Sequence, residues 1–91
     1  MDYSKFMNKK VLVRCYGAGV HFGTLEEIEG KAVRLSNARR LWKWTGGALS
    51  LHEVASKGID IKGSQISEPL EEIILPEHLE LIPLTSNISK L

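Results

Sequence analysis

The chain of 91 residues has few of the residues that fix small domains covalently or through metals. Its single cysteine, Cys15, excludes an intrachain disulfide, and the apolar run "VLVRCY" predicts a buried, inert thiol. The three histidines, His21, His52 and His78, are scattered, and no pair has the spacing of a zinc motif. The sequence therefore predicts no metal site and no cofactor.

Long apolar runs are also missing. No stretch approaches the roughly 20 residues of a membrane span, and the start "MDYSKFMNKK" lacks the apolar region of a signal peptide. We expect a soluble protein with no membrane contact and a cytoplasmic location.

Catalytic patterns are the third absence. "GAGVHFG" lacks the Lys-Ser/Thr of a Walker loop and does not match the dinucleotide fingerprint. The neighbouring acids Glu26-Glu27 and Glu71-Glu72 lie on expected strands, where adjacent side chains point to opposite faces. Because no nucleophile elbow and no converging carboxylate pair is present, we predict no catalytic residue and a protein that is not an enzyme.

Charge is balanced overall but unevenly placed. The net charge is only +1, which is low for a nucleic-acid-binding protein. Five basic residues without an acid lie between Lys31 and Lys43, and five acidic residues without a base lie between Glu68 and Glu80. A chain with two such segments can bind an anion at the basic one and a second copy of itself at the acidic one. Alternatively, each run is a solvated strand face.

Apolar alternation and turn residues predict the fold class. Expected strands cover residues 9–16, 20–28, 31–36, 39–44, 70–76 and 78–84, with a turn at Ser36-Asn37. Ser50 and Glu53 form a capping box for a short helix that ends at Gly58, and residues 59–69 are mostly a connection. We predict one mainly β (α+β) domain, residues 1–91, in which a twisted antiparallel sheet or small barrel of five or six strands holds one short inserted helix. The tail, residues 85–91, is expected to fray or to pack onto a neighbour.

The segment "LSNARRLWKWTGG" carries the strongest functional signal. Strand alternation puts Arg40, Trp42 and Trp44 on one face, where arginine can grip an anion and tryptophan can stack on a flat ring. In the alternative, both tryptophans are core, and Arg39 and Lys43 form a solvated face. The two readings can also both hold, with one tryptophan in the core and one at the rim of a pocket. The candidate ligand-binding residues are Arg39, Arg40, Trp42 and Trp44, with Gly17, Gly19 and His21 as further lining.

The block from Tyr16 to Gly58 resembles a family of small proteins of unknown function found in phages and prophages. The shared pattern is an "AGV-x-x-G-x-L" hairpin, then "V-x-L-x-x-ARR-[LI]-W-x-W-x-G-A-x-[ST]-L" and a short helix, and the double glycine Gly46-Gly47 departs from it. The resemblance implies no established activity. By analogy, small phage proteins of this kind are often oligomeric accessories, inhibitors of host proteins, or sponges for nucleotide immune signals.

A second, weaker resemblance is to small barrels of the Sm or SH3-like kind. The rhythm "F-x-G-x-L…G-x-x-V-x-L" from Phe22 to Leu35 is similar to their bent hairpins and implies binding of single-stranded nucleic acid.

Three functional hypotheses follow. The first is a non-enzymatic phage-type homo-oligomer that sequesters a small anionic nucleotide-like signal, of the cyclic nucleotide or cyclic ADP-ribose type, in the host cytoplasm. The second is a protein-interaction module with an apolar or acidic docking face between Leu70 and Leu84. The third is a single-stranded nucleic-acid binder.

Overall fold

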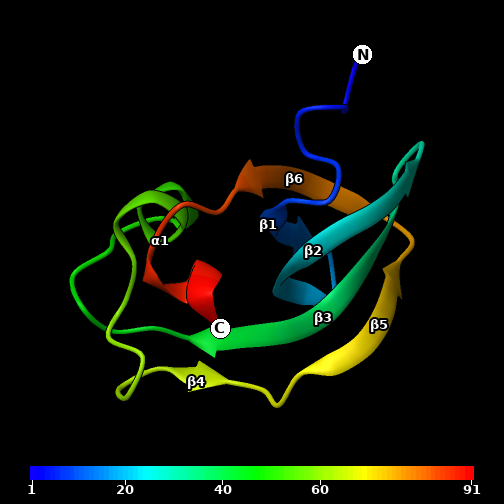
Figure 1. The fold of residues 1–91 in the computed structure, drawn as a ribbon. Helices are drawn as coiled ribbons and strands as arrows, with labels where there is room; N and C mark the ends of the chain where they lie inside the picture. Colours follow the sequence, from blue (N-terminus) through cyan, green and yellow to red (C-terminus); the bar gives the residue numbers. More distant parts are fainter.

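Six strands form one curled antiparallel sheet in the computed structural model, which describes residues 1–91 (Figure 1). The strands are β1 (Lys10–Cys15), β2 (Gly19–Glu29), β3 (Ala32–Lys43), β4 (Gln65–Ile66), β5 (Leu70–Leu75) and β6 (His78–Pro83). One α-helix, α1 (Leu51–Lys57), follows β3, and a 3-10 helical turn, Asn87–Lys90, ends the chain. The mainly β fold class with one short inserted helix is confirmed.

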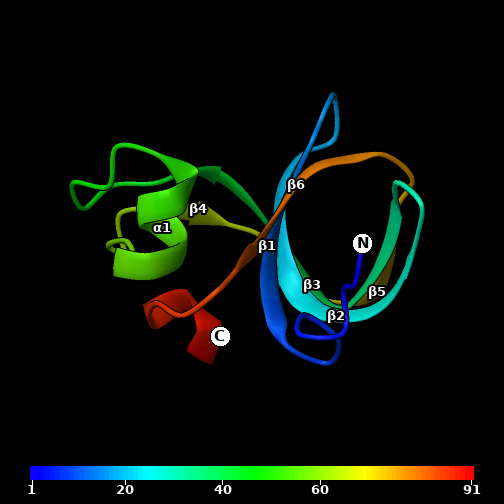
Figure 2. The ribbon, with the colours of Figure 1, turned by 90° about the horizontal axis from the view of Figure 1, so that it is seen from above.

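The pairing order explains the curl of the sheet. β2 lies between β1 and β3, β6 pairs with the other side of β1, and β4 and β5 share the other side of β3. β5 and β6 are separated only by Pro76 and Glu77, so one segment borders both ends of the sheet and wraps it into a ring (Figure 2). The N–H of His78 donates to the carbonyl of Lys31 at 2.9 Å and ties β6 to the β2–β3 turn.

β3 corrects one prediction. The third and fourth expected strands are a single strand of 12 residues, and Ser36-Asn37 does not turn the chain. Asn37 instead adopts a left-handed φ of 48°, and the β2–β3 register shifts at this point. Asparagine tolerates this conformation, so its turn chemistry produces a bulge within a continuous strand. Gly23 lies opposite the bulge, where a Cβ would stand 2.8 Å from the carbonyl oxygen of Ser36.

Side chains on both faces of the sheet are buried. The inner core, enclosed by the ring, consists of Val11, Val13, Cys15, Leu25, Val33, Leu35, Ala38 and Leu75. The outer core, between the ring and α1, consists of Leu12, Phe22, Leu41, Val54, Ala55, Ile59, Leu84 and Ile88. Successive residues of a strand point to opposite faces, so β1 contributes to both cores in turn. Burial raises the pKa of the Cys15 thiol, as a buried position requires.

The helix begins and ends where the sequence predicts. The Ser50 hydroxyl accepts a hydrogen bond from the Glu53 N–H at 3.4 Å, and the Glu53 carboxylate accepts one from the Leu49 N–H at 2.9 Å. Gly58 closes the helix with a φ of 91°. Val54 and Ala55 then face the outer core.

The tail packs against the chain's own outer core. The side-chain amide of Asn87 bonds both backbone groups of Ile59, accepting from the N–H at 3.2 Å and donating to the carbonyl at 2.7 Å. Ser86 donates to the carbonyl of Val54 at 2.7 Å, and Ile88 has no exposed surface. Of the two expectations for this segment, packing holds and fraying was wrong.

Candidate functional site

The β2–β3 register brings two basic side chains together. His21 lies directly opposite Arg40, and Gly19, two residues before His21, shares its face. His21, Arg40 and Trp42 border a hollow of about 370 Å³, called here the arginine hollow. Ala38, Leu70 and Ile73 supply its apolar wall, and Ser67 and Glu68 come from the connection between β4 and β5. The hollow thus combines cationic, aromatic and apolar groups from four segments.

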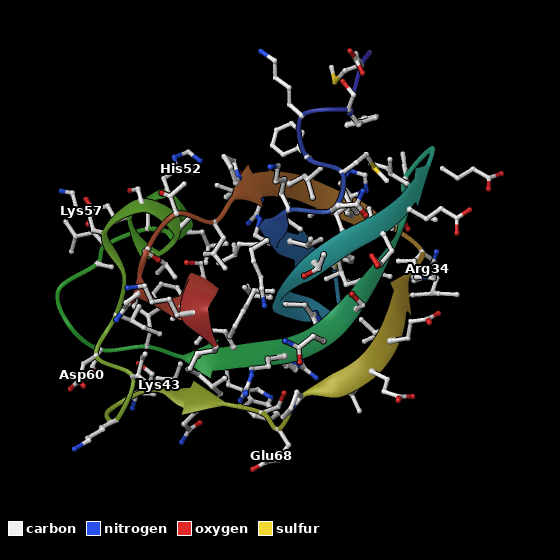
Figure 3. The ribbon with its side chains drawn as sticks, in the orientation of Figure 1. Arg34, Lys43, His52, Lys57, Asp60 and Glu68 are labelled. Carbon is white, nitrogen blue, oxygen red and sulfur yellow. The ribbon has the colours of Figure 1, made fainter.

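Arg40 is the cation that this site leaves free. Its guanidinium carbon lies 5.6 Å from the centre of the Trp42 ring, a cation–π distance. The ion pairs of the structure use Arg14, Lys31, Arg34 and His52, and none uses Arg40. Unlike Arg40, Arg34 is held near the other end of β3 by Glu27 and Glu72, and Glu68 points away from the sheet (Figure 3).

Gly19 acts through Arg40 and does not itself offer a binding group. Its φ is 81°, and a Cβ there would stand 3.1 Å from Nη2 of Arg40. Glycine therefore leaves room for the guanidinium as well as adopting the turn. Gly17 lies at the exposed tip of the β1–β2 turn, with nothing within 4 Å of its Cβ position, and does not border the hollow.

Arg39 is used mainly by the protein itself. Its Nη1 donates to the carbonyl of Ser67 at 3.3 Å, and its Nε is buried without a partner. The backbone of Arg40 adds two bonds to the same residue, because its N–H donates to the Ser67 hydroxyl at 2.8 Å and its carbonyl accepts from the Ser67 N–H at 2.9 Å. These contacts fix the β4–β5 connection against β3 and so shape one side of the hollow.

His21 lies deep in the site. Its residue is only 6% exposed, and Nδ1 is enclosed without any hydrogen-bond partner. Burial lowers the pKa of His21, and the positive charge of Arg40 lowers it further. Both causes disfavour a second proton on the ring, so the imidazole is neutral near pH 7.

The two tryptophans separate, which corrects the predicted shared face. Trp42 is 55% exposed at the edge of the hollow. Trp44 packs against the outer core, and its indole N–H donates to the carbonyl of Ala48 at 3.0 Å. β3 ends at Lys43, so the alternation that aligned the two rings stops before Trp44. One tryptophan therefore packs against the core and one lies at the rim of the hollow, as the combined reading predicts.

A second hollow shares Trp42 with the first. It measures about 460 Å³ and is bordered by Trp42, Ser64, Gln65 and Ile66. The sequence reading missed Gln65 and Ile66 as lining residues, because it treated residues 59–69 mostly as a connection. Their pairing with Leu41 and Lys43 is a long-range contact that local patterns do not report.

Two further features concern metal ligands and membrane-spanning helices. No group of three or more histidine, cysteine, aspartate or glutamate side chains gathers in a metal-binding arrangement. No helix in the structure combines the length and the apolar character that crossing a membrane requires.

Comparison with known proteins gives one match. The sequence model of a family described as a domain of unknown function (DUF6948) matches residues 8–90. No curated protein and no solved structure matches the chain.

Proposed function

The chain belongs to the DUF6948 family, whose description names no function, and we propose from its site that it is a non-catalytic binding protein. Its ligand is a small molecule that joins an anionic group to a flat ring, as a nucleotide does. Arg40 binds the anionic group, and Trp42 binds the ring.

The single observation that supports this proposal most is the state of Arg40. A half-buried guanidinium ordinarily has a carboxylate or carbonyl partner, since its donors form a planar fork that fits such oxygens. The Arg40 side chain forms no ion pair, packs beside the Trp42 ring and faces a hollow. A volume of about 370 Å³ falls within the roughly 300–1,000 Å³ range of small-molecule sites.

Trp42 is the residue that binds the flat ring of the ligand. Its indole borders both hollows, so an anion held by Arg40 on one side can carry a ring into the space beside Gln65 and Ile66. Stacking of a base on an aromatic side chain is worth about 1–3 kcal/mol and tolerates any base. A nucleotide-like ligand satisfies both halves of the site.

The biological setting stays a prediction. The resemblance to phage and prophage proteins favours a nucleotide signal of host defence, of the cyclic nucleotide or cyclic ADP-ribose type. In that setting a homo-oligomer in the host cytoplasm sequesters the signal and antagonises the defence.

The first experiment is a thermal-shift panel with cyclic AMP, cyclic dinucleotides, cyclic trinucleotides, ADP-ribose isomers and short single-stranded oligonucleotides, since a ligand that binds the native state raises its Tm. For a ligand that scores, Arg40→Gln is expected to weaken binding about tenfold or more, since a hydrogen bond to a charged group is worth about 1.5–3 kcal/mol. Trp42→Ala is expected to weaken it to a similar degree. Calorimetric titration measures both effects.

Lys43→Gln is the matched control for Arg40→Gln. It removes the same charge from the same strand, but Lys43 is exposed, forms no ion pair and does not border the arginine hollow. The affinity of this variant should stay within about twofold of the wild type, because Lys43 borders neither hollow and its exposed charge is screened by salt. A panel without any shift, or equal losses in the two variants, contradicts the assigned site.

A second candidate function, a protein-interaction module, is favoured by three exposed hydrophobic side chains. Leu70 and Ile74 on β5 and Leu79 on β6 are 55%, 64% and 51% exposed. Grouped exposed apolar residues often mark contact surfaces.

Self-association is the simplest contact of this kind, and sedimentation velocity over a concentration series measures it. If the surface joins two copies, Ile74→Glu should give a monomer at concentrations where the wild type associates. A wild type that stays monomeric throughout would argue against self-association at this surface.

A further inference from the structure

The imidazole of His21 is an unpaired polar group in the middle of the arginine hollow. Only 6% of the residue is exposed, and Nδ1 has no partner, whereas nearly all buried polar atoms in folded proteins are hydrogen-bonded. The sheet fixes the position of His21, because the residue lies within β2 and pairs with Val13 on one side and Arg40 on the other. Nδ1 itself is sealed from solvent, so an anion that the free Arg40 guanidinium binds in the hollow accepts a hydrogen bond from the other ring nitrogen, Nε2.

We infer that His21 is a second ligand-binding residue and that an anion bound by Arg40 brings one proton onto its imidazole. This inference rests on the anion site of the proposed function and adds to it a coupling between ligand and proton. The imidazolium then donates a charged hydrogen bond to the anion, as the guanidinium does.

The charged and titratable groups around His21 support this assignment. On β1, the nearest such group on the inner face is Cys15, a buried thiol that stays protonated because burial raises its pKa. On β3, Arg40 repels a proton on the ring, and Arg39 is bonded to Ser67. The only charged residue of the connection to β5 is Glu68, which borders the hollow but has an exposed side chain that points away from the sheet. β5 contributes apolar Leu70 and Ile73.

The sign of the coupling follows from these neighbours. In the empty site burial and Arg40 hold the pKa of His21 below its ordinary value. A bound anion offsets the charge of Arg40 and attracts a proton, so it raises the pKa of His21. A site whose group has a higher pKa in the bound state binds more tightly as the pH falls. Affinity should therefore rise as the pH is lowered from about 8 to about 5.

Sulfate and cyclic AMP are suitable probes. Each keeps a constant charge over this pH range, whereas a phosphate monoester has a second pKa near 6 and takes up protons on its own. NMR of the imidazole ring measures the titration midpoint of His21 with and without sulfate. His52 and His78 are internal controls in the same spectra, because neither borders the hollow.

We expect saturating sulfate to raise the midpoint of His21 by about one pH unit, which corresponds to about tenfold tighter binding at the acidic limit than at the alkaline limit. His52 and His78 should not follow. Arg40→Gln should raise the midpoint of the empty site and reduce the shift caused by sulfate. His21→Phe keeps a ring without donors, so it should weaken binding and remove the pH dependence, whereas His21→Asn keeps an N–H donor and should remove only the pH dependence.

The outcomes separate this inference from the proposed function. If cyclic AMP or another panel member binds through Arg40 and Trp42 while neither it nor sulfate changes the titration of His21, the proton coupling is wrong and the binding function stands. If sulfate shifts His21 but no nucleotide binds, the coupled anion site stands and the nucleotide assignment is wrong. If neither sulfate nor any member of the nucleotide panel binds, both are wrong.

Discussion

Replacing Gly23 with alanine should lower the free energy of unfolding by about 2–3 kcal/mol, the upper part of the range of about 1–3 kcal/mol expected when extra atoms are forced into a well-packed site. A Cβ at this position would stand 2.8 Å from the Ser36 carbonyl oxygen and 3.1 Å from the Ala38 Cα. Both are backbone atoms of β3, so no side-chain rotation relieves the contact. The two strands must separate at the bulge around Asn37. Urea unfolding of the two proteins measures the difference.

Gly30→Ala separates this steric effect from the backbone preference of glycine. Gly30 has a left-handed φ of 59°, and nothing lies within 4 Å of its Cβ position. Its cost should be only the left-handed penalty of about 1 kcal/mol. Gly23 has no such φ, so a Gly23→Ala loss no larger than that of Gly30→Ala would show that the β2–β3 contact is not as tight as the structure indicates.

The bulge around Asn37 also determines which residues meet in the site, because the strand register beyond it pairs His21 with Arg40. This dependence separates what the sequence can predict from what it cannot. Strands β1 and β2 and the helix start at Ser50 follow from alternation and capping, which are local. The single strand β3 does not, because Asn37 has the local signature of a turn, and hydrogen bonds from β2 and β5 on both sides keep the strand continuous.

The site was predictable in part for the same reason. Alternation correctly placed Arg40 and Trp42 on one face, because both lie within β3. It failed for Trp44, one residue beyond the end of the strand. Nothing local could show that His21 faces Arg40, since this depends on the register of two strands, nor that Leu70 and Ile73 close the hollow from β5.

Glycine shows a similar limit. Gly17 and Gly19 were predicted as further lining of the ligand site. The structure gives Gly19 another role, which is to leave space for the Arg40 guanidinium, and leaves Gly17 at an exposed turn. A glycine in a sequence signals that a side chain is excluded; only the fold shows which neighbouring group requires the space.

Ile88 provides the second large effect, in the segment where the sequence left fraying open. Ile88→Ala should lower the free energy of unfolding by about 3 kcal/mol, within the range of about 2–5 kcal/mol for truncating a buried isoleucine. The side chain has no exposed surface and belongs to the outer core with Leu12, Phe22 and Val54. Its removal leaves a cavity between the sheet and α1. The turn cannot move to fill it, because Asn87 and Ser86 are held by hydrogen bonds to the backbone of Ile59 and Val54. Urea unfolding with an unchanged slope would assign the whole loss to stability.

Lys90→Ala is the control from the same 3-10 turn, because Lys90 is exposed and forms no ion pair. Its effect should stay within about 0.5 kcal/mol, as for ordinary surface substitutions. The contrast tests a specific arrangement, since Asn87 and Ser86 hold the turn against Ile59 and Val54 by hydrogen bonds that either substitution leaves intact. Equal small losses in both variants would mean that the tail frays and that Leu12 and Phe22 are covered by α1 alone. A large loss confined to Ile88→Ala makes the last turn part of the core that supports β2 and β3 beneath the arginine hollow.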